Sequence, residues 1–262
     1  MAGEGSDNGR GNQKRESNKM AETFVLVHGA WHGGWCWAAV INQLERLGDR
    51  AFAVDLPGHG MNRADRSKVT LDSYVNSVAE FIERHDLKDI VLAGHSLGGL
   101  TIPGVAAKIP ARIKRVVWVT AMVALDGQPM VDPAMSPLPA AAETLPEGSI
   151  PIEMMGKEFL DGLTNDMAPA VKEYVLSALG PQPIGPVIAP VPMAPYFATG
   201  IPSSFIVCED DQTPIAGAPN WHPHFSSRLK NPTLKFVKSG HEVMFTHPVE
   251  CARALHELAV GE

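Results

Sequence analysis

The feature that most constrains this chain is a series of short apolar runs in which hydrophobic residues follow one another without alternation. A strand exposed on one face alternates apolar with polar residues, whereas a continuous apolar run marks a strand buried on both faces. Such strands occur in parallel sheets that helices cover on both sides. The runs lie at residues 22–29, 50–58, 89–95, 113–122, 203–208 and 234–240.

Amphipathic segments separate these runs, and their apolar residues recur with the spacing of a helix. Thr70 precedes one of them and is a good N-cap residue. Gly48 ends another, as glycine often does at the end of a helix. The alternation predicts an α/β fold with a mostly parallel central sheet flanked by helices. The predicted helices span residues 37–48, 71–85, 100–110 and 248–259.

The alternation breaks at residues 126–200, where Pro, Met and Ala accumulate. Loops this long in compact domains are usually functional, so we expect a small helical cap, or lid, inserted after the fourth predicted strand. It divides the core into residues 20–125 and 201–262. Residues 1–19 hold no large apolar side chain beyond Met1 and are expected to form a disordered tail.

The composition limits the class of function. A formal net charge of −7 without a Lys/Arg-rich patch disfavours binding to nucleic acid. No apolar run approaches the ~18 residues of a membrane helix, so no membrane partner is expected. Three scattered cysteines and no signal peptide indicate a reducing, cytoplasmic compartment. The sequence leaves the oligomeric state open, with a homodimer among the states it allows.

A serine interrupts the third apolar run. Residues 94–98, Gly-His-Ser-Leu-Gly, match the pattern G-x-S-x-G between a predicted strand and a predicted helix. The flanking residues of such a tight turn must be small, because a Cβ there would clash with the backbone. The N–H groups at the start of the following helix point toward an oxygen that the serine attacks. Ser96 is therefore the predicted nucleophile.

A serine hydroxyl is a weak nucleophile and needs a base that a carboxylate orients. In this kind of site the chain order is serine, acid, histidine. Of the ten histidines, His241 directly follows the last predicted strand, with Gly240 leaving the loop free to turn. The others precede or adjoin the serine, precede the last strand, or lie at or inside the final helix. His241 is the predicted base.

The acid is expected in the loop after the strand at 203–208, where Glu209, Asp210 and Asp211 are candidates. A carboxylate three residues beyond the end of the strand favours Asp211. The position of Pro214 argues for Asp210, because such an acid more often has its proline four residues on. We favour Asp211 and keep Asp210 as the alternative.

The negative oxygen formed during acyl transfer needs two N–H donors. Leu97, directly after the serine, supplies one. The loop after the first strand, residues 28–31, supplies the other, which we assign to Ala30. Both contributions come from the backbone, so the side chain at position 30 need only be small.

Several stretches of the chain together resemble the α/β-hydrolase fold, and more narrowly its branch of plant methylesterases, hydroxynitrile lyases and pyrethroid-hydrolase-type bacterial esterases. The resemblance covers roughly residues 22–258 and is weakest across the cap. It implies a central, mostly parallel sheet with a small helical cap, and a Ser-His-Asp triad that works without a cofactor. The stretches that carry it are FVLVHGAWHGGWCW, VDLPGHG, TLDSYV, LAGHSLGG and GHEVMFTHP.

Two positions discriminate within this branch. The lyases typically carry Thr or Asn where this chain has Gly29, and many carry Lys after the catalytic His, where this chain has Glu242. A carboxylate there would repel a developing cyanide ion. Hydrolysis of a small, largely apolar ester is therefore the expected reaction. The alternatives on the same fold are a small-molecule receptor without turnover and a cofactor-free lyase or oxygenase.

The substrate pocket is expected to be apolar and adaptable, because the cap is rich in Met, Pro and Ala. His222 and His224 lack the further ligands that would complete a metal site. The glycine-rich stretch after the first strand lacks a dinucleotide-binding pattern, so neither metal nor cofactor is expected. The residues assigned to substrate binding are Trp31, His95, Met122, Tyr196 and Phe197.

Overall fold

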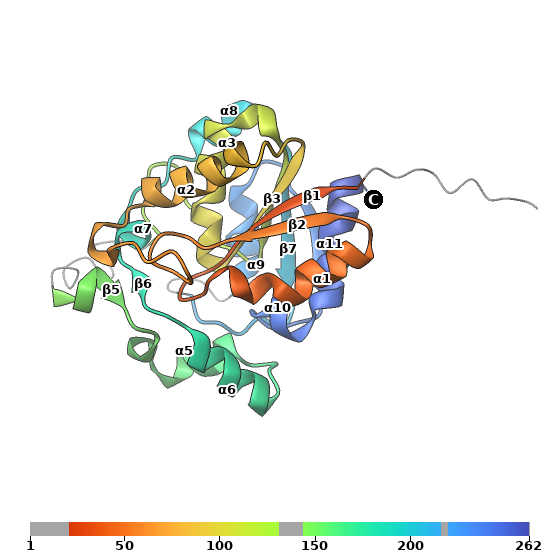
Figure 1. Ribbon diagram of the computed structural model, residues 1–262. Coiled ribbons are helices and arrows are strands. Elements are labelled where there is room, and N and C mark those ends of the chain that lie inside the picture. The colour runs from red at the N-terminus through yellow and green to blue at the C-terminus, as the bar shows by residue number, and fades with distance from the viewer. Residues whose placement is uncertain (1–20, 131–143, 216–219, 262) are drawn as a thin grey trace, which may run out of the picture.

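The computed structural model describes residues 21–130, 144–215 and 220–261. A six-stranded sheet with the order β2-β1-β3-β4-β7-β8 forms its centre (Figure 1). Every neighbouring pair in this sheet is parallel, as the apolar runs predict. The strands are β1 (Thr23–Val27), β2 (Arg50–Val54), β3 (Ile90–His95), β4 (Ile113–Val119), β7 (Ser203–Cys208) and β8 (Thr233–Val237).

The continuous apolar runs arise because helices cover both faces of the sheet. Neighbouring side chains of a strand point to opposite faces. In β1, Phe24 and Leu26 belong to one hydrophobic cluster, and Val25 and Val27 belong to the other. All four are fully buried, so no position in this strand can be polar without a burial cost.

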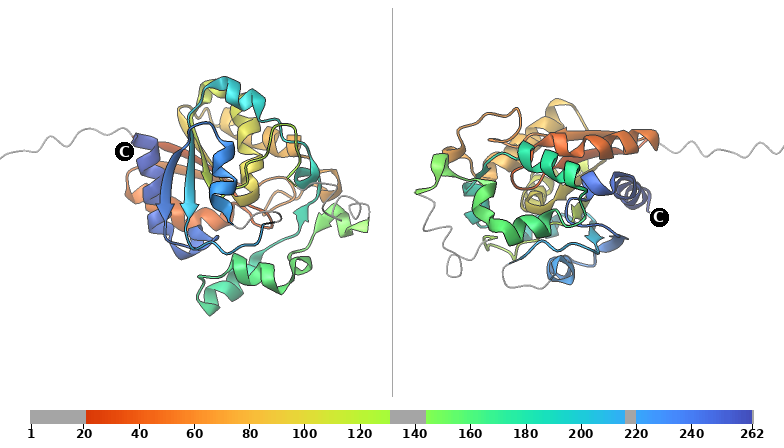
Figure 2. Two further views of the ribbon diagram at one scale, coloured as in Figure 1. Left: turned by 180° about the vertical axis from the view of Figure 1, so that it is seen from behind. Right: turned by 90° about the horizontal axis from the view of Figure 1, so that it is seen from below.

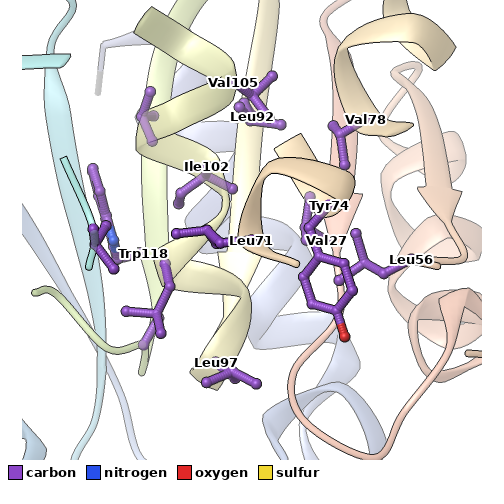
Figure 3. Packing of buried hydrophobic residues seen from close by; sticks show 14 of the residues in the cluster. Val27, Leu56, Leu71, Tyr74, Val78, Leu92, Leu97, Ile102, Val105 and Trp118 are labelled. Atoms are coloured by element: carbon purple, nitrogen blue, oxygen red, sulfur yellow. The ribbon is translucent and has the colours of Figure 1, made fainter. Parts of the chain in front are cut away.

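Two layers of helices complete the core. Helices α1 (Ala38–Arg46) and α11 (Pro248–Val260) pack on the Phe24 face. Helices α2 (Leu71–Arg84) and α3 (Ile102–Lys108) pack on the other, and Figure 3 shows their side chains against those of the strands. The helix expected at 100–110 starts late, because a 3₁₀ turn, η3 (Ser96–Leu100), precedes it.

The segment after β4 leaves the sheet, and Figures 1 and 2 show α5 and α6 apart from the helices that cover it. The short strands of this segment, β5 and β6, pair with each other in antiparallel fashion. Its elements are η6 (Pro146–Gly148), β5 (Ser149–Ile150), η7 (Ile152–Met155), α5 (Gly156–Leu163), α6 (Pro169–Ala178), β6 (Gln182–Pro183) and α7 (Gly185–Ile188).

One helix of the expected lid belongs to the core instead, since α8 (Ala194–Thr199) packs against α3. Residues 131–143 of the expected lid, and the expected tail at 1–19, lie outside the described residues. Within the described ranges, no helix combines the length and apolar character needed to cross a membrane. The remaining helical turns are η1 (Gly34–Trp37), η2 (Arg66–Lys68), η4 (Pro110–Arg112), α9 (Trp221–His224), η8 (Ser226–Arg228) and α10 (Val243–Thr246).

The predicted N-cap of α2 forms a reciprocal pair of hydrogen bonds. Thr70 Oγ1 accepts from the Ser73 N–H at 3.1 Å, and Ser73 Oγ accepts from the Thr70 N–H at 3.2 Å. We expect Thr70→Ala to lower the free energy of unfolding by about 1 kcal/mol. Thr70→Ser keeps the hydroxyl and should retain most of the stability of wild type. Urea denaturation measures both variants. An equal loss in both variants would show that the hydroxyl is not the stabilising group.

Candidate active site

The turn at Ser96 joins the end of β3 to η3. Ser96 has φ = 49°, a left-handed conformation that is uncommon for a residue with a side chain. Such strain costs about 1–3 kcal/mol and clusters at functional sites. The G-x-S-x-G stretch therefore forms the sharp strand-to-helix turn that its pattern predicts.

Two glycines make this turn possible. A Cβ on Gly94 would lie 2.9 Å from the backbone of Gly98, and a Cβ on Gly98 would lie 2.7 Å from the carbonyl oxygen of His28. Both distances are shorter than side-chain contacts allow. The turn therefore packs backbone against backbone on the loop that follows β1.

His241 lies in the loop after β8 and contacts one carboxylate. Its Nδ1 lies 2.6 Å from Oδ2 of Asp211, and both side chains are almost fully buried, at 1% and 2% exposure. Asp211 accepts two further hydrogen bonds, from Thr120 Oγ1 at 2.8 Å and from the Thr213 N–H at 2.9 Å. These bonds hold the carboxylate in one orientation toward the imidazole.

Of the two acids that the sequence left open, Asp211 is the one that contacts His241. Asp210 is exposed, and its hydrogen bonds to the described residues involve its backbone alone. Its N–H donates to the Ser239 carbonyl, and its carbonyl accepts from Asn165 Nδ2. The carboxylate three residues beyond β7 thus turns inward, and the one before it points to solvent.

The contact between Asp211 and His241 shifts the pKa values of the two groups in opposite directions. Burial alone would raise the pKa of Asp211, but the charge and hydrogen bond of His241, with those from Thr213 and Thr120, outweigh it and lower the pKa. Burial alone would lower the pKa of His241, but Asp211 outweighs it and raises the pKa. An ionised carboxylate can only accept, so Nδ1 carries the proton and Nε2 keeps the lone pair that a base needs.

The two predicted oxyanion donors come from segments that touch. Leu97 is the second residue of η3, so no carbonyl of its own turn can accept its N–H. Ala30 lies in the loop after β1, and no acceptor for its N–H appears among the hydrogen bonds of the described residues. The close approach of Gly98 to His28 brings these two segments together.

Two hydrogen bonds connect the turn at Ser96 to the segments that carry His241 and Thr120. His95 Nε2 donates to the carbonyl of His241 at 3.0 Å, and the two imidazole rings lie 4.8 Å apart. The carbonyl of Ser96 accepts from the Met122 N–H at 3.0 Å, two residues beyond Thr120. Ser96, His241 and Asp211 therefore lie at the same edge of the sheet, where β3, β4, β7 and β8 end.

Of the residues predicted to bind substrate, Met122 contacts the turn at Ser96 and Trp31 contacts the inserted segment. Met122 is half-buried beside Ser96. The indole N–H of Trp31 donates to the Ile150 carbonyl at 2.9 Å, and its ring meets Phe159 of α5 edge-on at 5.7 Å. Trp31 also lines a cavity of about 350 Å³ that the loops after β1 and β2 form with the end of α6.

The prediction that His95 binds substrate needs correction. Its side chain is fully buried, and burial lowers its pKa to about 3. Adjacent side chains of a strand point to opposite faces, so the turn that presents Ser96 directs His95 into the interior. There it supports the loop of His241 rather than facing a substrate.

The prediction that Tyr196 and Phe197 bind substrate also needs correction, because both residues lie on α8, which packs on the core. The Tyr196 ring packs against Trp118 at 5.5 Å, and its hydroxyl pairs with Ser203 Oγ at 2.8 Å, at the start of β7. The Phe197 ring lies 4.7 Å from the Lys230 ammonium. We assign Tyr196 to the core and Phe197 to a half-buried position at the margin of that core.

Two residues of the site were not assigned to it from the sequence. The Trp221 ring lies 4.5 Å from that of His241, and its N–H donates to the Thr213 carbonyl at 3.1 Å. Glu242 is fully buried, 3.3 Å from His32. The position of Glu242 directly after His241 is the sequence signal from which its place in the site could have been predicted.

One group in the described part of the chain has donor atoms within 4.8 Å of one another, namely His95, His241 and Glu242. Two imidazoles and a carboxylate are a donor set that zinc accepts. One nitrogen of each imidazole is already bonded, to the His241 carbonyl and to Asp211 respectively. A metal there would take the lone pair that His241 needs as a base.

Comparison with known proteins identifies relatives of this chain. It is 42% identical to the carbendazim hydrolyzing esterase of Nocardioides sp. (strain SG-4G) over 120 residues, which are 45% of this chain and 48% of that protein. It is 31% identical to putative methylesterase 12, chloroplastic, of Arabidopsis thaliana over 188 residues, which are 66% of this chain and 53% of that protein. The chain thus spans about half the length of these two relatives.

Solved structures show the same architecture over more of the chain. An extracellular alpha/beta-hydrolase from a Paenibacillus species has a TM-score of 0.82 at 28% identity, covering 91% of this chain and 98% of that one. A pyrethroid hydrolase from Sphingobium faniae JZ-2 has a TM-score of 0.71 at 25% identity, covering 92% and 98%. The model of the alpha/beta hydrolase family matches residues 24–254. With this sheet, this turn and this match, the chain belongs to the alpha/beta hydrolase family.

Proposed function

We propose that this chain is a carboxylesterase-type serine hydrolase that cleaves small, largely apolar esters through an acyl-enzyme intermediate. The main support is the buried 2.6 Å contact between Asp211 and His241, at the sheet edge where Ser96 occupies its strained turn. The esterases and methylesterases among the relatives support the same class of reaction. The proposed chemistry needs no metal or cofactor.

In the first half of the proposed reaction, His241 Nε2 takes the proton of the Ser96 hydroxyl as its oxygen attacks the ester carbonyl. The tetrahedral intermediate then collapses. The C–O bond to the alcohol breaks, and the imidazolium returns its proton to the leaving alkoxide. Asp211 stabilises the imidazolium and keeps the imidazole in the correct tautomer without taking a proton.

In the second half, His241 takes a proton from water, and the resulting hydroxide attacks the acyl-enzyme. Collapse of the second intermediate breaks the bond to Ser96, which recovers its proton from the imidazolium and releases the acid. The N–H groups of Leu97 and Ala30 stabilise the negative oxygen in both halves. One such donor typically contributes about 3–4 kcal/mol to the transition state.

The substrate class is inferred from the relatives and from the side chains near the base. The names of the relatives refer to carbendazim, pyrethroid and methyl ester hydrolysis. In this chain Trp221 packs on His241, Met122 adjoins Ser96, and Trp31 reaches the cap. These surroundings favour an apolar acyl or alcohol group. We propose that the segment from η6 to α7, residues 146–188, acts as the lid over it.

Replacing the nucleophile tests the proposal. We expect wild type to hydrolyse p-nitrophenyl and methyl esters and to be labelled by a fluorophosphonate, and Ser96→Ala to lose the label and about 10⁶-fold in kcat. Ser227→Ala, at an exposed serine, is the matched control and should keep both. Labelling without turnover but with stabilisation by ligand would favour a receptor. Oxygen consumption with a heteroaromatic compound would favour an oxygenase.

Replacing each acid separately tests the assignment of Asp211. Asp211→Asn keeps the shape but holds the imidazole in the wrong tautomer, so we expect kcat to fall by about 10⁴-fold. Asp210→Asn should change kcat by less than about twofold, because exposed side chains away from the site have small effects. Initial rates with a p-nitrophenyl ester measure both. A larger loss in Asp210→Asn would contradict the assignment.

The pH dependence should follow the protonation of His241. Activity requires a neutral imidazole, and Asp211 raises the pKa of His241 above its ordinary value. The rising limb of kcat/KM should therefore have its midpoint above pH 6.5, the unperturbed value for histidine. In Asp211→Asn the residual rising limb should move to lower pH. A rising limb that stays in place would show that the carboxylate does not set the pKa of the base.

A further inference from the structure

A second carboxylate lies buried beside the base and has no part in the proposed mechanism. Glu242 directly follows His241 and is fully buried. Its Oε2 lies 3.3 Å from His32 Nε2, and neither carboxylate oxygen has a partner of regular hydrogen-bond geometry among the described residues. A buried carboxylate that stays ionised needs a nearby positive charge.

His32 supplies that charge. Its Nδ1 lies 2.8 Å from the Ala30 carbonyl oxygen, which can only accept, so Nδ1 carries a proton. Its Nε2 faces the Glu242 carboxylate, which also only accepts, so a lone pair there would be repelled and a proton is attracted. Trp35 and Phe245 flank the ring at 5.6 and 6.0 Å, and aromatic faces favour a cation. Both nitrogens of His32 thus face acceptors, an arrangement that favours the imidazolium.

The other titratable groups around Glu242 agree with this assignment. His95 donates through Nε2 to the His241 carbonyl and stays neutral, since burial lowers its pKa to about 3. Burial also keeps Cys36 neutral by raising its pKa. Burial alone would raise the pKa of Glu242, but the charge of His32 outweighs it and lowers the pKa to about 2.

The same imidazolium holds the loop that carries the predicted oxyanion donor. His32 binds the Ala30 carbonyl, and His28 Nδ1 donates to the Gly29 carbonyl at 2.8 Å. The Gly29 carbonyl and the Ala30 N–H belong to one planar peptide group, so a bond to the first orients the second. Trp31, next in the chain, has φ = 64°, a conformation that surrounding contacts must maintain.

We propose that Glu242 and His32 form a buried ion pair that positions the oxyanion loop relative to the base. The pair joins the residue after His241 to the carbonyl of Ala30. It therefore fixes the position of the loop that carries the oxyanion donor relative to the loop that carries the base. The inference rests on the proposed function, because it assigns a task within the same site. Both are positioning residues, since they act through Ala30 and His241.

The charge of Glu242 has a second consequence. It adjoins His241 and, with the larger effect of Asp211 and the smaller one of Asp166, raises the pKa of that imidazole. Removing the charge therefore favours the neutral base at lower pH. A residue with a purely structural role would not move the pH profile in this direction.

The primary test is Glu242→Gln, which keeps the shape and removes the charge. We expect kcat to fall about tenfold through misplacement of the oxyanion loop, with KM changed by less than about twofold. The rising limb of kcat/KM should move to lower pH. Glu250→Gln, at an exposed glutamate on α11, is the matched control and should leave kcat and the pH profile unchanged. An unchanged kcat and rising limb in Glu242→Gln would overturn the proposal.

A double-mutant cycle tests the coupling. His32→Asn keeps a short donor for the Ala30 carbonyl but loses the charge, which leaves Glu242 unpaired. The combination with Glu242→Gln removes both charges and restores a neutral interior, so it tests the pair even if the single His32 variant folds poorly. Its loss of kcat should be smaller than the product of the single losses. Multiplicative losses would contradict a coupled pair.

A measurement that does not depend on turnover separates this inference from the proposed function. The ¹⁵N chemical shifts of the His32 ring should show both nitrogens protonated at pH 7.5 in wild type, and one in Glu242→Gln. A neutral His32 in an enzyme labelled at Ser96 would overturn the ion pair and leave the esterase standing. A charged His32 without ester turnover would overturn the esterase and the positioning role.

Discussion

The close approach of the turn at Ser96 to the loop after β1 determines where the other groups of the site can lie. A side chain on Gly98 would meet the His28 carbonyl oxygen at 2.7 Å, so two backbone segments touch with no side chain between them. This contact brings together the two backbone segments that carry Leu97 and Ala30. The strain at Ser96, with φ = 49°, is tolerated because the surrounding structure fixes the turn: β3 before it and the 3₁₀ turn η3 that begins with it are buried throughout.

The parts of this arrangement that depend on backbone geometry could be predicted from the sequence. The continuous run of β1 predicts a strand covered on both faces, and the glycines at 94 and 98 predict a turn without room for side chains. The position of His241 after the last strand follows from chain order. In each case one local pattern has a single structural outcome, so no knowledge of distant residues is needed.

Side-chain environments could not be predicted in the same way, because they depend on which segments meet in space. Tyr196 is an aromatic residue in a segment expected to form the lid, yet α8 packs on α3 and its hydroxyl pairs with Ser203. His95 adjoins the nucleophile in sequence but points into the interior. Trp221 and His241 are twenty positions apart, and only the fold brings their ring centres to within 4.5 Å.

His28 and His32 are both buried beside the candidate site, but their hydrogen-bond partners favour different protonation states. His28 donates from Nδ1 to the Gly29 carbonyl and accepts at Nε2 from the Leu56 N–H, so it is neutral, and burial lowers its pKa to about 4. His32 faces acceptors at both nitrogens, which is the arrangement of the proposed ion pair with Glu242. In a low dielectric each assignment is stabilised strongly, because a wrong proton would leave two acceptors or two donors facing each other.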